Sequence, residues 1–192
     1  MPSGKLQNDN AICEMASKRS RIELPSPQAA GVFVLGAGIF PRMYYRPGVA
    51  AIIQNSAGRI LICERNDVRG AWQFPQGGIE AKESGVEALA RELLEELSLS
   101  PDAYEVIESR GPYRYQFPAG QTKRGFRGQA HHYFRVRLLR ANTPMNLNSG
   151  HPEFRATRWI EPADFNIAWL PAMKRAAYRR VFRDFFAIDL GH

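Results

Sequence analysis

The segment from Ser84 to Leu97 has the periodicity of an amphipathic helix, and it constrains the fold more than any other part of the chain. At about 100° per residue, four apolar side chains fall in one narrow stripe that is expected to face the core. These are Val86, Ala90, Leu93 and Leu97. Three carboxylates gather on a different face, namely Glu92, Glu95 and Glu96. The segment therefore predicts a packed helix that presents a cluster of negative charge.

Grouping carboxylates at these spacings on a helix has an energetic cost. Like charges three or four residues apart destabilise an isolated helix by about 0.2–0.5 kcal/mol per pair. A hard divalent cation such as Mg²⁺ would offset this repulsion, because it prefers carboxylate oxygens together with waters and substrate phosphates. Glutamate is also a good helix former, so a solvated acidic face would have the same pattern. The spacing alone leaves both interpretations open.

The charge balance of the chain favours a polyanionic partner. The sequence holds 26 Lys and Arg against 19 Asp and Glu, which gives a formal net charge of +7. Between Arg110 and Arg140 several residues are basic and none is acidic, and a second basic concentration runs from Lys174 to Arg183. This distribution is typical of binding to nucleotides or nucleic acids, although two solvated basic faces would have the same composition.

Other broad features predict a cytoplasmic globular protein. A chain of 192 residues, 44% of them hydrophobic, suits one domain with a core of its own. No apolar run approaches the roughly 18 residues of a membrane span, and the first residues are too polar for a signal peptide. Cys13 and Cys63 lack metal-binding spacing, so both are predicted to be free thiols. We expect no membrane contact and no obligate protein partner.

A change in composition divides the chain into two parts. Residues 1–42 are predicted to be a flexible N-terminal extension, and residues 43–192 the folded domain. The expected strands are Val49–Ile53, Arg59–Glu64, Tyr104–Ser109, Tyr113–Phe117, His131–Leu139 and Arg155–Ile160. A second helix is predicted from Pro171 to Phe186. Its packing residues are expected to be Tyr178, Val181, Phe182 and Phe185.

A longer pattern surrounds the first helix. It reads Gly77, five residues, Glu83, seven residues, Arg91-Glu92-Leu93, one residue, Glu95-Glu96, one residue, Ser98-Leu99. This pattern resembles the Nudix box and spans residues 77–99. Ser98 stands where the family has a glycine, which would end the helix in a left-handed conformation that serine tolerates less well. The departure affects no carboxylate.

The resemblance implies a fold and a metal site. Nudix proteins are α/β proteins that fold as an α/β/α sandwich with a central mixed sheet, and the box forms a loop, a helix and a loop. By the match, Mg²⁺, or alternatively Mn²⁺, would be bound by Glu92, Glu95, Glu96 and the carbonyl of Gly77. Arg91 would pair with Glu83, and both would support catalysis by Glu96.

The resemblance also covers residues 44–187, where the chain is similar to the bacterial RNA pyrophosphohydrolase branch. The residues that carry it are Tyr45-Arg46-Pro47, Trp72 to Gly78, Pro152-Glu153-Phe154 with Trp159, and Lys174-Arg175 with Tyr178 to Val181. Glu153 matches a glutamate that faces the metals, so it is a candidate metal ligand or general base. The match implies substrate binding by Arg46, Trp72, Gln76, Met173 and Lys174. An aromatic position that stacks on a base in some members is Met173 here, and an arginine of the loop before Trp72 is replaced by Asn66. Base stacking is therefore expected to be weaker or to come from Tyr113, Tyr115 or Arg69.

The function implied by the resemblance is metal-dependent removal of pyrophosphate from 5′-triphosphorylated RNA, by attack of water on a phosphoanhydride. Hydrolysis of dinucleoside polyphosphates such as diadenosine tetraphosphate, or of other nucleoside diphosphate derivatives, would use the same metal site, and the sequence separates these substrates poorly. A non-catalytic RNA-binding Nudix domain would be expected to lack box carboxylates, all of which are present here. His131 and His132 are interpreted as ordinary strand residues.

Overall fold

The computed structural model describes residues 45–141, 143–148 and 152–191. The predicted extension at residues 1–42 and the thiol of Cys13 lie outside these residues. In chain order the elements are β1 (Tyr45–Gln54), β2 (Ile60–Arg65), β3 (Trp72–Gln73), β4 (Gln76–Gly78), α1 (Gly85–Leu97), η1 (Pro101–Ala103), β5 (Tyr104–Gln116), β6 (Gly128–Leu138), β7 (Phe154–Ile160), η2 (Pro162–Asp164), η3 (Ile167–Trp169) and α2 (Ala172–Phe186).

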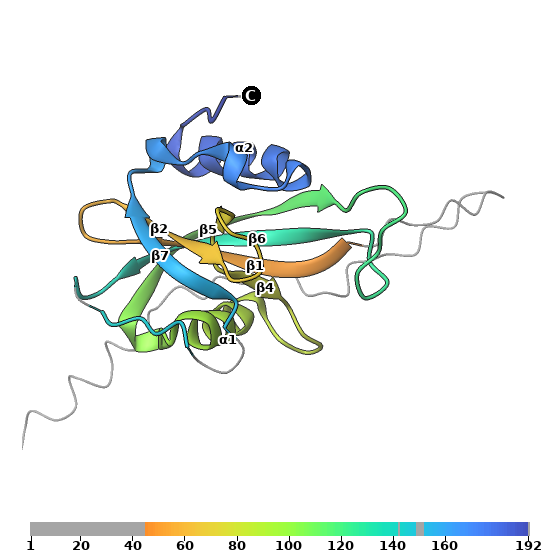
Figure 1. The fold of residues 1–192 in the computed structure, drawn as a ribbon. Coiled ribbons are helices and arrows are strands. Elements are labelled where there is room, and N and C mark those ends of the chain that lie inside the picture. The colour runs from red at the N-terminus through yellow and green to blue at the C-terminus, as the bar shows by residue number, and fades with distance from the viewer. Residues whose placement is uncertain (1–44, 142, 149–151, 192) are drawn as a thin grey trace, which may run out of the picture. The chain divides into compact units, whose positions relative to one another are not determined.

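The strands form one seven-stranded mixed sheet. Its order is β3-β2-β1-β6-β5, with β4 paired to β1 and β7 paired to β2. The pair of β1 and β6 is parallel, and the other pairs are antiparallel. The central strand β1 is buried from Gly48 to Ile53, as expected for a strand covered on both faces. Figure 1 shows α2 on one face of the sheet and α1 on the other, which confirms the predicted α/β/α sandwich.

The core between α2 and the sheet is rich in aromatic rings. Phe74 stacks on Tyr178 with ring centroids 5.4 Å apart, and the Tyr178 hydroxyl accepts a hydrogen bond of 3.1 Å from the backbone nitrogen of Phe74. The predicted packing residues of α2 are all buried, which confirms that stripe: Tyr178, Val181, Phe182 and Phe185. Lys174 lies on the same stripe one turn earlier, so helical periodicity places its side chain against the sheet.

Local signals fix both ends of α1. Ser84 is the N-cap of a capping box, because its hydroxyl accepts from the backbone of Glu87 while the Glu87 carboxylate accepts from the backbone of Ser84. At the other end Ser98 is left-handed, with φ 55° and ψ 32°. The backbone nitrogens of Ser98 and Leu99 donate to the carbonyls of Leu94 and Leu93 at 3.0 Å each. Serine thus adopts the conformation that glycine would take at this position.

The buried face of α1 differs from the predicted one. Val86 is 41% exposed and Ala90 is half-buried. The buried residues are Gly85, Ala88, Leu89, Leu93, Glu96 and Leu97. On a helix these residues span an arc centred near Glu96, so the predicted separation of apolar and acidic faces is wrong. The reason is that α1 packs on β1 and β4 through the arc that includes Glu96, so this carboxylate points into the protein.

Two further sequence predictions need correction. The strands expected at residues 104–109 and 113–117 are one strand, β5. Gly111 and Pro112 lie in it where the register with β6 shifts between Arg110 and Tyr113. Since β5 is an edge strand, proline is tolerated at this bulge. The segment expected to be a loop before the box contains the short strands β3 and β4.

Two other features bear on the class of the protein. Cys63 is a buried free thiol, as predicted. Within the described residues, no helix combines the length and the apolar character needed to cross a bilayer.

Candidate active site

The carboxylate of Glu96 is the most unusual group in the described part of the chain. Its side chain is 7% exposed, and neither oxygen has a hydrogen-bond partner among the described residues. Burial raises its pKa well above the ordinary value, and the nearby charges of Glu153 and Glu92 raise it further. An unpartnered buried carboxylate is costly, and a cation bound beside it would relieve that cost.

Glu92 approaches the same place from the preceding turn of α1. Its carboxylate lies against the backbone of β4, where a Cβ added to Gly77 would stand 1.7 Å from Glu92 Oε1. Burial raises the pKa of Glu92, although Arg91 opposes this shift. Only a glycine at position 77 lets the β4 backbone and this carboxylate lie so close together.

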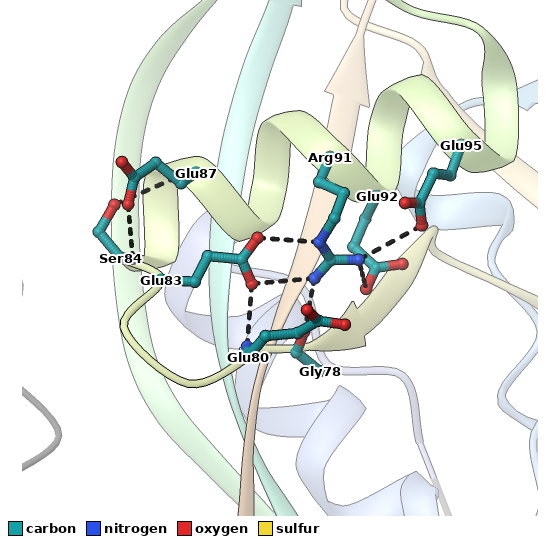
Figure 2. A network of polar contacts seen from close by, with 8 residues as sticks. All are labelled: Gly78, Glu80, Glu83, Ser84, Glu87, Arg91, Glu92 and Glu95. Atoms are coloured by element: carbon teal, nitrogen blue, oxygen red, sulfur yellow. Dashed lines mark hydrogen bonds and ion pairs between the residues drawn. The ribbon is translucent and has the colours of Figure 1, made fainter.

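Arg91 forms hydrogen bonds with several parts of the Nudix box, as Figure 2 shows. Its guanidinium donates two hydrogen bonds to Glu83, from Nε to Oε1 at 2.8 Å and from Nη2 to Oε2 at 3.0 Å. It also donates to the carbonyl of Gly78 at 2.8 Å, to Glu92 at 2.9 Å and to Glu95 at 3.3 Å. The hydrogen bonds from Arg91 lower the pKa of Glu83. The guanidinium therefore fixes the loop, the strand β4 and the acidic helix relative to one another.

The acidic residues fit a divalent cation that is bound jointly with substrate. Within the described ranges, no three His, Cys, Asp or Glu side chains form a compact ligand cluster by themselves. Glu92 and Glu95 are held by Arg91, and Glu95 is 59% exposed. The unpartnered oxygens of Glu96 supply the hard anionic donor that Mg²⁺ prefers, and this ion usually keeps waters and substrate phosphates as further ligands.

Glu153 precedes β7 and is anchored by the loop after β2. The backbone nitrogen of Asn66 donates to the carbonyl of Glu153 at 2.8 Å. The guanidinium of Arg155 in turn donates to the carbonyl of Asn66 at 2.8 Å. Asn66 thus joins this loop to the segment that carries Glu153. The family resemblance had identified it only as the residue that replaces an arginine. The Glu153 side chain is exposed, and its charge is felt at Glu96.

A buried lysine of α2 lies within electrostatic range of Glu153 and Glu96. The side chain of Lys174 is 5% exposed, and its Nζ donates to Gln73 Oε1 at 2.8 Å. The same nitrogen lies 5.7 Å from the ring centre of Tyr115. Burial lowers the pKa of Lys174 to about 7, and the positive charges of Arg65 and Lys123 act in the same direction. An anionic ligand would favour the charged form of this amine.

Arg46, Gln76 and His131 line the region beside this lysine. The Arg46 guanidinium packs on Gly78, where an added Cβ would stand 2.0 Å from Nη2. Gln76 Oε1 and His131 Nδ1 are buried and have no hydrogen-bond partner among the described residues. The pKa of His131 is lowered to about 3, chiefly by burial. The positive charges of Lys174 and Arg46 lower this pKa further. The imidazole is therefore neutral at ordinary pH.

The other residues expected to contact substrate are buried or half-buried. Trp72 is 8% exposed, with the Arg158 guanidinium 4.5 Å from its ring centre and the Trp169 ring at 6.4 Å. Met173 is half-buried in the first turn of α2. Tyr113 and Tyr115 are 7% and 8% exposed, so neither offers an open ring face for stacking, contrary to that expectation. The roles of Trp72 and Met173 in substrate binding stay predictions.

The sequence reasoning missed Gln73 and did not predict the burial of His131. The signal for Gln73 was a single amide between Trp72 and Phe74 in an otherwise apolar segment, which suggests a buried polar residue with a partner. Lys174 falls on the apolar stripe of α2, so the need for such a partner could have been inferred. The burial of His131 depends on pairing with Gly48 and Tyr113 across three strands, which periodicity alone does not give.

Comparisons with known proteins show the family of the chain. The family model described as NUDIX domain matches residues 44–185. An RNA pyrophosphohydrolase of Helicobacter pylori (strain P12) is 44% identical over 151 residues, covering 73% of this chain and 93% of the relative. An RNA pyrophosphohydrolase of Zymomonas mobilis is 35% identical over 149 residues, covering 74% and 96%.

Solved structures extend the likeness to the fold. A binary complex of a Caenorhabditis elegans Ap4A hydrolase has a TM-score of 0.53 at 18% identity, covering 74% of this chain and 98% of that one. At that identity the likeness concerns the fold alone. Because the family match spans most of the chain and the relatives are matched over nearly their full length, the chain belongs to the Nudix hydrolase family.

Proposed function

We propose that this Nudix hydrolase removes pyrophosphate from the 5′-triphosphorylated end of RNA. The observation that carries the proposal is that a buried carboxylate without a hydrogen bond, Glu96, lies close enough to the buried amine of Lys174 to affect its pKa. The names of the relatives support the choice of RNA. In the reaction, water adds across a phosphoanhydride bond, so that pyrophosphate leaves and a 5′-monophosphorylated RNA remains.

The acidic side of the site would hold the metal. Nudix hydrolases generally use divalent metal ions, and here we infer Mg²⁺ bound by Glu96, Glu92 and Glu95, with the carbonyl of Gly77 and with Glu153 as further candidates. Bound there, the ion would neutralise phosphate oxygens and lower the pKa of a bound water. Glu153 is exposed and close enough to affect the pKa of Glu96, so it suits the role of a general base that accepts the proton of the attacking water. The ion pair of Arg91 and Glu83 would hold the loop and the acidic helix in position around the metal.

The basic side would bind and orient the polyphosphate. Lys174 and Arg46 supply positive charge on the side of the site opposite to α1, and neither forms an ion pair within the described residues. Gln76 offers an unpartnered buried amide oxygen beside them. Arg46 and the protonated form of Lys174, which an anionic ligand favours, would reduce the cost of bringing a highly charged chain to an acidic site. Both would therefore act mainly on substrate affinity.

Measuring initial rates on two substrates tests this function. The full chain with Mg²⁺ is given either 5′-triphosphorylated RNA or diadenosine tetraphosphate, and released pyrophosphate and nucleotides are separated. We expect a higher kcat/KM for the RNA. The Glu96→Gln variant serves as the control for contaminating phosphatases. If the dinucleotide is cleaved faster by orders of magnitude, the RNA assignment fails and the dinucleoside polyphosphate alternative replaces it. No turnover of either substrate would favour a binding function.

A further inference from the structure

A group of basic side chains lies at one end of the sheet. The register of β5 and β6 pairs Gln116 with Gly128 at the end where these two strands are joined. The register of β1 and β6 places Tyr45 and Arg46 at the same end. In Figure 1 the connection between β5 and β6 extends beyond the sheet at the end where β1 begins. We call Arg114, Lys123, Arg124 and Arg127 the hairpin cluster; all four are exposed.

The hairpin cluster differs from the other basic groups of these strands in having no acidic partner. Toward the opposite end of the β5–β6 pair, Arg110 and Arg135 both pair with Glu108, and Arg137 pairs with Glu105. Among the described residues, no member of the cluster forms an ion pair. Charge is therefore compensated within the protein along most of the hairpin and left uncompensated at its tip.

Backbone hydrogen bonds close the tip. Phe117 donates to the carbonyl of Arg127 at 2.9 Å, and Lys123 and Phe126 exchange backbone hydrogen bonds of 3.0 and 3.1 Å. Between them Arg124 and Gly125 have φ of 53° and 80°, as in a type I′ turn. Asparagine or glycine suits the first of these positions better than arginine does, so the charge of Arg124 is present at a cost to the turn.

The hairpin cluster is continuous with the substrate side of the site. The charge of Lys123 is close enough to Lys174 to lower the pKa of that buried amine. Arg114 lies over the ring of Tyr45, 5.8 Å from its centre, next to Arg46 in β1. Half-buried aromatic rings, Tyr45, Phe117 and Phe126, alternate with the basic groups. Alternation of cations with aromatic rings is a feature of surfaces that bind single-stranded nucleic acid.

We propose that the hairpin cluster binds the phosphate backbone of single-stranded RNA downstream of the 5′ end that enters the active site. The inference rests on the proposed function and extends it. It makes the cluster a determinant of substrate class: a long RNA reaches the tip of the hairpin, whereas a dinucleotide ends before it. Affinity for RNA should thus grow with chain length and fall with salt, in proportion to the phosphates contacted.

A charge-neutral hairpin tests the proposal. The variant K123Q/R124N/R127Q removes three charges and keeps a residue at position 124 that tolerates a left-handed backbone. The matched control, R140Q/R180Q/R183Q, removes three exposed charges from the region beyond the far end of β6 and from the outward side of α2. Fluorescence anisotropy of labelled 12-nucleotide and 3-nucleotide RNAs gives Kd in a series of salt concentrations, and pyrophosphate release gives KM for their 5′-triphosphorylated forms.

The hairpin variant should weaken binding of the 12-nucleotide RNA about tenfold and reduce its salt slope by about 2, since each phosphate contact on a single strand contributes about 0.7. Binding of the 3-nucleotide RNA and the kcat on both should stay within twofold, and the control variant should match the wild type. Equal losses on both lengths, or none, would overturn the proposal. Hairpin-dependent binding without release of pyrophosphate would support this inference while refuting the proposed function. A hairpin effect on double-stranded RNA alone would also count against it.

Discussion

The backbone of Gly77 lies against the carboxylate of Glu92 so closely that a Cβ on the glycine would stand 1.7 Å from Oε1. In Gly77→Ala we expect a folded protein whose Glu92 side chain swings away, because the carboxylate is the free end of a flexible chain. A displacement of about 1 Å in such a site costs about 100-fold in rate. The loss should appear in kcat.

Gly78→Ala provides the contrast. Its Cβ would meet the Arg46 guanidinium at 2.0 Å, which belongs to the basic side of the site. This variant should raise KM more than it lowers kcat. Circular dichroism and thermal melting of both proteins would show that each is folded. The same kinetic change in the two variants would contradict the separation of metal and substrate roles.

Metal binding should be visible in stability as well as in activity. Glu96→Gln removes a buried charge that has no partner, so the variant should be at least as stable as the wild type without metal. Adding Mg²⁺ at about 100 times its Kd should stabilise the wild type by about 2.7 kcal/mol. The variant should show little of this increase and no turnover. A melting temperature that rises equally in both proteins would remove Glu96 from the metal site.

Gln73 is expected to act through Lys174. In Gln73→Glu the ammonium gains an anionic partner 2.8 Å away, so its charge is no longer available to substrate phosphate and KM for RNA should rise. If Gln73 acts only through the lysine, Gln73→Glu added to Lys174→Met should cause little further loss. Additive losses in that double-mutant cycle would indicate a merely structural role. Gln73→Met serves as an uncharged comparison.

His131 should make the fold sensitive to mild acid. Its pKa is about 3 in the folded chain, against an ordinary value of 6.5. Between these two pH values the imidazole is therefore protonated in the unfolded chain and neutral in the folded chain. The free energy of unfolding should fall by about 1.4 kcal/mol per pH unit as the pH drops from 6.5 toward 3. Urea unfolding of the wild type and of His131→Phe between pH 7 and 5 measures this difference. Parallel pH profiles would show that His131 is not the cause.

Ser98→Gly should stabilise the protein without altering catalysis. The left-handed backbone of Ser98 costs a non-glycine residue about 1 kcal/mol. In a chain of this size that energy corresponds to a rise in Tm of about 2–4 °C. The Ser98 hydroxyl donates only a long hydrogen bond, 3.4 Å, to the carbonyl of Asn146, so little is lost with it. A lower Tm would mean that this contact is stronger than its length implies.

Much of the fold could be predicted because local signals and the global fold agree. The start of α1 at Ser84 and the periodicity of α2 depend on near neighbours, and both agree with the sequence prediction. Where distant contacts decide, the sequence was less informative. Two strands were expected at residues 104–109 and 113–117, but they are one edge strand, β5, in which a bulge accommodates Pro112.

The candidate site was predictable in its residue types but not in its environment. The helical pattern placed Glu96 with the other carboxylates on a face apart from the apolar stripe, and charged residues are rarely buried. Its burial follows from packing of α1 on β4 across Gly77, a contact between segments that no single-helix periodicity contains. Gln73 was missed for the same reason, since its partner Lys174 is 101 residues away.

The two helices that build the site lie on opposite faces of the sheet (Figure 1). A refolding chain with only α1 docked would have the acidic groups without Lys174, and one with only α2 docked would have the reverse. Recovery of enzymatic activity should therefore lag behind recovery of helical signal. Turnover would begin only once the second helix had docked. Truncation before α2 would yield an inactive fragment even if the Nudix box were intact.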